Sequence, residues 1–343
     1  MVSPVSSITA RSGLPGLDGR RLVRLMAAAI ERCQLDLAGQ VVLTEAATGA
    51  YAVTPVLAAL AGAQVHALAA GTRYATAREL AAGTAELARL AGVADQIELI
   101  PAKTPGVAGA ADIVTNSGQV RPIDAAMVGQ LKPSAVIPLM YESWEYRGTD
   151  VDLEACRSRG IPVAGTNETH PAVDVFSFLG PMAVKQLHDA GVAVYGSDIV
   201  LLCDNPFAPF IAEYLRACGA RVVQAAELGA ASLAGPPDAV LLALRPAAEP
   251  VLGAAAVTTL GELAPGTVLV QYWGDADRAA AAAAGVPVWP PEAPPPGHMG
   301  VLPSAVGPEP IVRLQAGGLK VGQVLARGLD RASAADLAFA QIL

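Results

Sequence analysis

Two histidines lie in loops where their rings could take part in acid–base chemistry. His170 ends the polar run TNETH after an apolar run, and His298 lies in the run PGHMG of a Pro-rich segment. The unperturbed pKa of histidine is about 6.5, so either ring could exchange a proton near neutral pH. A structural role stays open for both, in a helix-capping loop around His170 and as one loop-holding hydrogen bond for His298. His66 and His188 are expected to be structural or solvated.

Polar side chains also follow three of the predicted strands. Asn116 and Ser117 come after ADIVT, Glu142 and Glu145 lie in YESWEYR after AVIPLM, and Asn167 follows PVAGT. Ligands of open α/β sheets bind at the carboxyl ends of the strands, so we expect these five residues to contact substrate. An aromatic side chain beside carboxylates suits a cationic or amino-acid substrate. The alternative for YESWEYR is a surface loop whose Trp packs back on the core.

Three further segments are weaker candidates for an anion contact. The turn 45–51 follows the first strand, Arg73 follows the second, and Arg313 precedes the pair Gly317 and Gly318. The Gly pair is expected to form a turn or a hinge between elements. The spacing typical of metal ligands, of a Walker loop and of a GxSxG nucleophile is absent from the sequence, so we expect no metal site.

Composition excludes several classes of protein. Of the 343 residues 53% are hydrophobic and 16% charged, which excludes a disordered chain, and the net charge of −8 argues against nucleic-acid binding. The four cysteines include no CxxC pair, which predicts reduced thiols and a cytoplasmic protein. Residues 1–13 lack an apolar stretch, and the uncharged residues 46–72 contain Pro55 and His66, so we expect no signal peptide and no membrane contact.

Short apolar runs alternate with helical patterns from residue 40 onward. The expected strands are 40–43, 64–68, 96–100, 112–115, 135–139, 162–164, 198–202, 221–224, 239–244 and 267–271. The expected helices are 17–36, 55–61, 75–90, 123–131, 151–159, 173–190, 209–218 and one from about residue 320 to the end, while the Pro-rich stretch 286–310 is expected to be irregular. This alternation predicts an α/β fold of two Rossmann-like, doubly wound parallel-sheet domains joined by a crossover helix.

The run VDLEACRSRGIPV, residues 151–163, resembles a segment of the D-isomer-specific 2-hydroxyacid dehydrogenases, the formate/glycerate dehydrogenase-like group. The long helix after it and the next strand, turn, helix and Gly are in the order of that family. The resemblance covers roughly residues 111–300 and describes a divergent member. It implies an N-terminal helical segment 1–39, a substrate and catalytic domain 40–172 with 311–343, and a nucleotide-binding domain 173–310.

The resemblance also implies a cofactor, NAD or NADP, and the residues that would hold it. The three glycines of the family's GxGxxG turn fall on Cys203, Asn205 and Ala208. Glycine serves in such a turn because the backbone must approach the pyrophosphate closely. The residues expected near the cofactor are Asn205, Pro206, Phe207, Glu227, Arg245 and Trp273.

The catalytic residues of the family are matched only in part. The resemblance implies that His298 is the general acid for the carbonyl oxygen, with Glu292 as a loosely matched carboxylate partner. His170 is the second candidate for this proton transfer. Trp273 and Gly274 stand where the family has its catalytic arginine, and the nearest arginine is Arg278.

These features predict an NAD(P)-linked oxidoreductase-like enzyme that acts on a small polar carboxylate, in biosynthesis, as a cytoplasmic homodimer. The alternative is a fold relative without hydride chemistry, either a non-redox enzyme or a ligand-binding module. The replaced glycines and the missing arginine favour the alternative, whereas the order of elements favours the oxidoreductase.

Overall fold

The chain forms two compact units. The computed structural model describes residues 14–72, 75–230 and 235–343. Unit 1 consists of residues 1–175 and 307–343, and unit 2 of residues 176–306. The candidate Arg73 lies outside the described residues. The four cysteines are free thiols, as the sequence predicts.

Unit 1 is built on parallel strands that follow one another in a doubly wound order. One group is β3 (Ile97–Ile100), β2 (Gln64–Leu68), β1 (Val41–Glu45) and β4 (Ile113–Val114), and the other is β5 (Ile137–Pro138), β6 (Val163–Thr166) and β12 (Ala340–Ile342). A parallel bridge between Ile113 and Val136 joins the two groups. Among the described strands of this unit, only β12 runs antiparallel to its neighbour. The strand order therefore reverses at β1 and β4, where sheets of this kind open a crevice for ligands.

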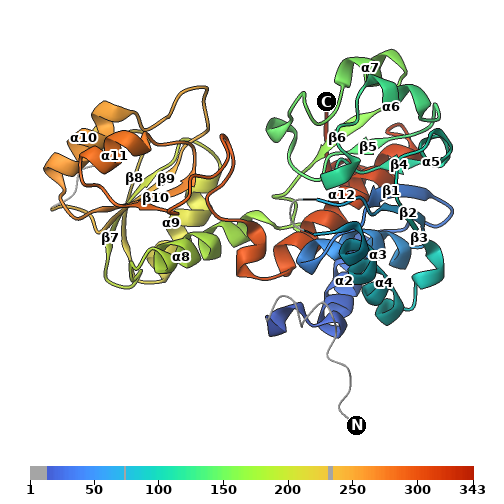
Figure 1. Ribbon diagram of the computed structural model, residues 1–343, viewed down its shortest axis with the longest axis horizontal. Coiled ribbons are helices and arrows are strands. Elements are labelled where there is room, and N and C mark those ends of the chain that lie inside the picture. Colours follow the sequence, from blue (N-terminus) through green and yellow to red (C-terminus); the bar gives the residue numbers. More distant parts are fainter. Residues whose placement is uncertain (1–13, 73–74, 231–234) are drawn as a thin grey trace, which may run out of the picture. The chain divides into compact units, whose positions relative to one another are not determined.

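Helices cover both faces of this sheet (Figure 1). One face carries α2 (Gly19–Cys33), α3 (Val53–Leu60), α4 (Ala77–Ala91) and α12 (Glu309–Arg327), which contact one another. The other face carries α5 (Pro105–Ala110), α6 (Ala125–Gln130) and α7 (Leu153–Ser158). Leu22 and Met26 of α2 are fully buried in the core of unit 1, so the N-terminal helix is part of this unit.

Helix α12 lies close to the sheet because glycines face it. A Cβ atom on Gly317 would lie 2.8 Å from Val173, one on Gly322 would lie 2.8 Å from Ile113, and one on Gly318 would clash with the sulfur of Met140. The predictions of a turn at Gly317 and Gly318 and of a helix that begins near residue 320 are therefore wrong. The glycines permit close helix–sheet packing, and the helix begins at Glu309.

Unit 2 is a second, five-stranded parallel sheet. Its order is β11 (Val288–Trp289), β10 (Val268–Trp273), β9 (Ala239–Ala243), β7 (Asp198–Leu202) and β8 (Arg221–Ala225). Helices α8 (Leu179–Asp189) and α9 (Phe207–Ala217) lie on one face, and α10 (Ala254–Leu263) and α11 (Arg278–Ala283) on the other (Figure 1). The switch point of this sheet lies between β7 and β9. The predicted fold of two Rossmann-like units is thus confirmed.

Three sequence predictions about elements are wrong in detail. The helix expected over 173–190 is interrupted at its start, where Asp174 has φ of 51°, and regular helix begins at Leu179 within unit 2. The stretch 286–310 contains strand β11 and the 3-10 turn η8 (Pro303–Val306). The end of the chain is not one helix, since α13 (Ala334–Leu337) and β12 follow α12. Short elements and Ala-rich elements show too weak a periodicity of apolar residues to be located from the sequence.

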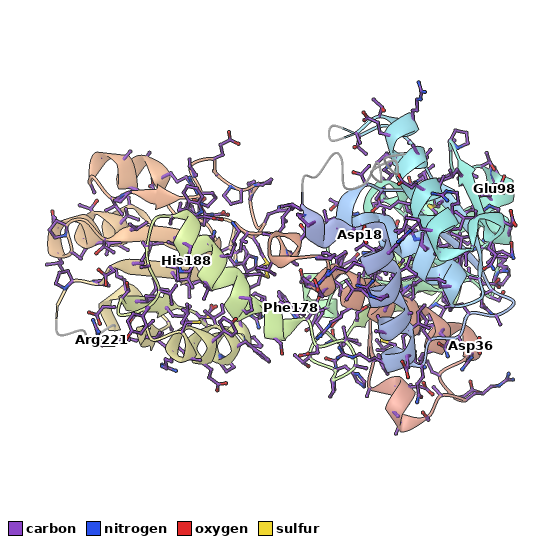
Figure 2. All side chains as sticks on the ribbon, turned by 90° about the horizontal axis from the view of Figure 1, so that it is seen from below. Asp18, Asp36, Glu98, Phe178, His188 and Arg221 are labelled. Atoms are coloured by element: carbon purple, nitrogen blue, oxygen red, sulfur yellow. The ribbon has the colours of Figure 1, made fainter. Side chains whose placement is uncertain are left out.

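The two histidines expected to be structural or solvated, His66 and His188, lie on a strand and on a helix. His188 is exposed on α8, where Figure 2 labels it. His66 is half-buried on β2, and its Nδ1 atom lies 2.9 Å from a carboxylate oxygen of Glu98 on β3.

Candidate functional site

The carboxyl ends of β4, β5 and β6 bring most of the predicted substrate-side residues to one edge of the unit 1 sheet. The backbone ladder continues past the short strand β5, since Leu139 N donates to Ala164 O at 2.8 Å and Thr166 N donates to Tyr141 O at 2.9 Å. The loops 141–146 and 167–170 therefore leave the sheet side by side.

Glu142 ties these two loops together. Its Oε1 atom accepts a hydrogen bond of 3.0 Å from the backbone N–H of Glu168, and its Oε2 atom accepts one of 2.6 Å from the Trp144 indole. The Glu142 side chain is only 6% exposed. A buried carboxylate with two N–H donors is held in one place, so Glu142 is a fixed acceptor at this edge.

Glu145 and Glu168 lie beside Glu142, and together we call the three the carboxylate cluster. Burial raises the pKa of Glu145 to about 7, against the attraction of Arg147. Burial also raises the pKa of Glu168 well above its usual range, and the nearby Glu145 and Glu142 carboxylates raise it further. The cluster therefore holds protons at neutral pH, because like charges in a low-dielectric site cannot all ionise.

The backbone of the loop after β5 rests directly on β6. A Cβ atom on Gly165 would lie within 2.7 Å of Cα of Ser143, so only glycine fits beneath the 3-10 turn η5 (Ser143–Glu145). Ser143 N donates to Oε1 of Gln341 on β12 at 2.8 Å. The C-terminal strand thus supports the loop that carries the carboxylate cluster.

Asn116 reaches the same edge from β4. Its Oδ1 atom accepts a 2.7 Å hydrogen bond from Met140 N, two residues before Glu142. Its side chain is buried, with 2% exposure, and its Nδ2 group has no hydrogen-bond partner among the described residues. A buried amide nitrogen without a partner among protein atoms is uncommon.

Ser117 turns instead toward β1. Its hydroxyl lies 2.6 Å from the Thr115 hydroxyl and 3.2 Å from the Thr44 hydroxyl, and Thr115 is 2.9 Å from Thr44. Glu45 ends β1 beside this group, accepts a hydrogen bond from Gln119 N at 3.1 Å, and has a pKa raised by burial. The Ser117 hydroxyl is therefore engaged by Thr115 and Thr44, and its role in substrate binding stays a prediction.

Asn167 and His170 are occupied by structural contacts. Asn167 donates from Nδ2 to Ala338 O at 2.9 Å and accepts from Thr169. The His170 ring stacks on Phe339 at 3.7 Å, and its Nδ1 atom accepts from Ala172 N at 3.1 Å. Burial lowers the pKa of His170, which leaves the ring neutral at pH 7. These contacts favour the interpretation of this segment as a capping loop.

The turn after β7 in unit 2 occupies the place of the family's glycine turn. Asn205 closes it, because its Nδ2 atom donates to Ala243 O on β9 at 2.6 Å while its Oδ1 atom accepts from Phe207 N at 3.1 Å. The exposed Asp204 carboxylate accepts from Arg245 N at 3.0 Å. The Asn205 side chain and the Asp204 carboxylate thus occupy the switch point between β7 and β9.

This turn does not fit the pyrophosphate of a dinucleotide held by a glycine turn. Such an anion needs free amides at the start of the following helix, and here Phe207 N bonds Oδ1 of Asn205, Ala208 N bonds Asn205 O, and Pro209 has no N–H. The carboxylate of Asp204 would repel a phosphate at the same place. The three glycine positions, Cys203, Asn205 and Ala208, all carry side chains that the turn uses for packing or hydrogen bonds.

Aromatic rings pack beside the turn. The Phe207 ring lies 5.2 Å from the Trp273 ring and 5.3 Å from the Phe176 ring, and Phe207 and Trp273 are buried. The Trp273 indole donates to Gly297 O at 3.2 Å. Phe207 and Trp273 therefore belong to the core of unit 2, and their contact with a cofactor stays a prediction, as does that of Pro206.

The remaining residues expected in unit 2 do not converge. His298 is exposed with Nδ1 3.2 Å from Pro296 O, and no hydrogen bond or ion pair joins it to Glu292 within the described ranges. Arg278 bonds Oε1 of Gln271 at 2.7 Å and Pro290 O at 2.8 Å, so it braces the sheet. Glu227 lines an apolar cavity of about 490 Å³ with Val200 and Leu260.

The sequence did not single out Glu168 as a site residue, although Glu168 lies in the polar segment TNETH. Its proximity to Glu145 depends on the pairing of β5 with β6, which joins residues far apart in the chain. In the part of the chain that the structure describes, no group of three His, Cys, Asp or Glu residues could hold a metal ion. No helix among those residues is long and apolar enough to span a membrane.

Comparison with known proteins identifies the class of fold. No protein-family model and no curated protein sequence matches the chain. Solved structures do match. A component of dipicolinate synthase from Bacillus halodurans has a TM-score of 0.52 and 11% sequence identity, over 82% of this chain and 96% of that one.

Two further structures are similar over most of their length. The corresponding component of dipicolinate synthase from Bacillus subtilis has a TM-score of 0.51 and 11% identity, over 87% of this chain and 98% of that one. A putative D-3-phosphoglycerate dehydrogenase from Ralstonia solanacearum has a TM-score of 0.49 and 13% identity, over 87% and 97%. At 11% identity the similarity to the two dipicolinate synthase components shows the fold alone, and that fold is the α/β architecture expected from the sequence.

Proposed function

We propose that this chain binds a small polar molecule at the carboxyl edge of unit 1 and works without hydride transfer, as a non-redox enzyme or a ligand-binding protein. The observation that carries the proposal is the Asn205 side chain, which bridges Ala243 O and Phe207 N across the turn after β7. This bridge occupies the hydrogen-bonding groups that a dinucleotide would use. A protein that binds no dinucleotide there cannot use one for hydride transfer.

Two features of unit 2 support the same conclusion. Arg278 is engaged by Gln271 and Pro290, and His298 is exposed and has no carboxylate partner among the described residues. A proton donor in hydride transfer is normally positioned by a second group. In unit 1, by contrast, Glu142, Glu168 and Asn116 are buried and Glu145 is half-buried, at an edge where α/β proteins bind ligands.

The second candidate is an NAD(P)-linked oxidoreductase that acts on a small polar carboxylate, in biosynthesis, with His298 as its general acid. The fold favours it, because the similar structures include components of dipicolinate synthase, whose name describes synthesis of a small polar carboxylate. In that case Asn205 would have to release Phe207 N before a dinucleotide could bind. A cytoplasmic homodimer is proposed for either function.

Titration with NADH and NADPH separates the two candidates. Tryptophan fluorescence or calorimetry would follow binding to the parent chain and to the double variant Cys203→Gly with Asn205→Gly, which restores the first two glycines of the turn. We expect no saturable binding to the parent. Binding by the parent that the double variant tightens would support the oxidoreductase and overturn the proposal.

A further inference from the structure

Residues 329–343, which we call the C-terminal strap, form an outer edge of the unit 1 sheet. The strap contains α13 and β12, and β12 pairs antiparallel with β6 (Figure 1). Among its side chains only that of Phe339 is buried, and Ile342 is 55% exposed. A segment with one buried side chain and a strand of three residues has few contacts to break. The strap should therefore open more easily than the rest of unit 1.

A buried ion pair holds the C-terminal strap to α12. The Lys320 side chain is only 4% exposed, and its Nζ atom lies 2.8 Å from Oδ1 of Asp336 on the strap. The ammonium group also donates to Gln34 O at 3.3 Å and lies 5.6 Å from the centre of the Phe339 ring. The hydrogen bond from Lys320 lowers the pKa of Asp336, so this carboxyl group is ionised at neutral pH. A buried ammonium group needs such a partner, because an unpaired charge is costly away from water.

The strap occupies hydrogen-bonding groups of the two loops that follow β5 and β6. Ala338 O accepts from Nδ2 of Asn167, and Phe339 O accepts from the backbone N–H of Asn167, both at 2.9 Å. Oε1 of Gln341 accepts from the backbone N–H of Ser143 at 2.8 Å. These three N–H groups lie at the edge where the sequence predicts ligand binding. They can donate fully to another acceptor only after the strap has opened.

We propose that the C-terminal strap is an autoinhibitory element, held closed by the Lys320–Asp336 pair over the N–H groups of Ser143 and Asn167. In the closed state these donors are satisfied within the chain. In the open state they face solvent, and the Lys320 ammonium group becomes hydrated. The opening is a property of unit 1 alone, whereas its consequence for binding of a small polar molecule rests on the proposed function.

Three variants test the ion pair. Asp336→Asn keeps an acceptor for the Ser333 hydroxyl but leaves Lys320 buried without an anion, so it should favour the open state, in which the ammonium group is hydrated. Adding Lys320→Met removes the buried charge and keeps an unbranched side chain of similar length, so the double variant should close again. Asp330→Asn, exposed on the same strap, is the matched control and should behave as the parent does.

Hydrogen exchange of the full chain, read by mass spectrometry on short peptides, measures the opening. Leu343 N donates to Val163 O and Asn167 N donates to Phe339 O, so both amides lose their acceptors when the strap opens. In the parent they should exchange at least about tenfold faster than the amides of β2, which is paired on both sides. Asp336→Asn should accelerate their exchange by a further factor of at least about ten and leave β2 unchanged.

The parent alone decides whether the strap opens by itself. Exchange of Leu343 and Asn167 at the rate of β2 would overturn the proposal, because the strap would then open only when unit 1 unfolds. Equal acceleration by Asp336→Asn and by the double variant would overturn it as well, since the buried charge of Lys320 would then have no effect on closure. Failure of the proposed function shows separately, as NADH binding by the parent, and leaves these exchange rates as predicted.

Discussion

The substitution Glu145→Gln should stabilise the protein above neutral pH and leave its stability at acidic pH unchanged. Burial raises the pKa of Glu145 from 4.5 to about 7, so the folded protein keeps a proton that the unfolded chain loses at lower pH. The stabilising effect of this proton is complete below about pH 4.5 and is lost as the pH rises through about 7. At about 1.4 kcal/mol per pH unit and proton, the loss amounts to about 3 kcal/mol by pH 8.

Glutamine resembles the protonated acid, so the variant should escape this loss. Its free energy of unfolding at pH 8 should exceed that of the parent by up to about 3 kcal/mol, and the two should coincide near pH 4.5. Denaturant unfolding between pH 4.5 and 8.5 measures both curves. Glu154→Gln, exposed on α7, should follow the parent throughout. Parallel curves for the parent and Glu145→Gln would refute the account of this buried carboxyl group.

Four further substitutions test the packing of η5, the turn after β7 and the role of His298. Gly165→Ala should displace η5 and cost about 1–3 kcal/mol in unfolding free energy, whereas Gly106→Ala, with nothing within 4 Å of its Cβ, should not destabilise. Asn205→Ala removes the bridge to Ala243 and Phe207 and should cost about 0.5–2 kcal/mol, measured by thermal unfolding. His298→Asn should leave ligand binding and the unfolding temperature unchanged, because the ring is exposed. A loss of turnover by about 10²–10⁴-fold in a folded His298→Asn variant would instead support the oxidoreductase.

Much of the sheet could be predicted from apolar runs alone. Strands β2 and β7 begin and end at the residues expected, since each is a short run rich in apolar residues that follows a glycine-containing turn. β12 could not be predicted, because it has three residues and is defined by its pairing with β6. The glycines of α12 were misread for a similar reason, since their role depends on contacts with Met140 and Ile113, which are distant in the sequence.

The candidate site was predictable in its residues more than in its geometry. Glu142, Glu145 and Asn116 stood out because polar residues follow apolar strands. Their coupling to Glu168 depends on strand pairing, which the sequence does not specify. At position 205 the sequence shows a residue other than glycine, but only the structure shows its bond to Ala243, on the neighbouring strand. That bond changes an incomplete cofactor motif into a closed turn.

The measurement that tests the central claim most directly is a calorimetric titration of the intact, unmodified chain with NADH at neutral pH. With Asn205 bonded across the turn and Asp204 beside it, we predict no saturable heat at ligand concentrations up to the millimolar range. A saturable isotherm with one NADH per chain and micromolar affinity would contradict the claim and establish unit 2 as a dinucleotide-binding domain.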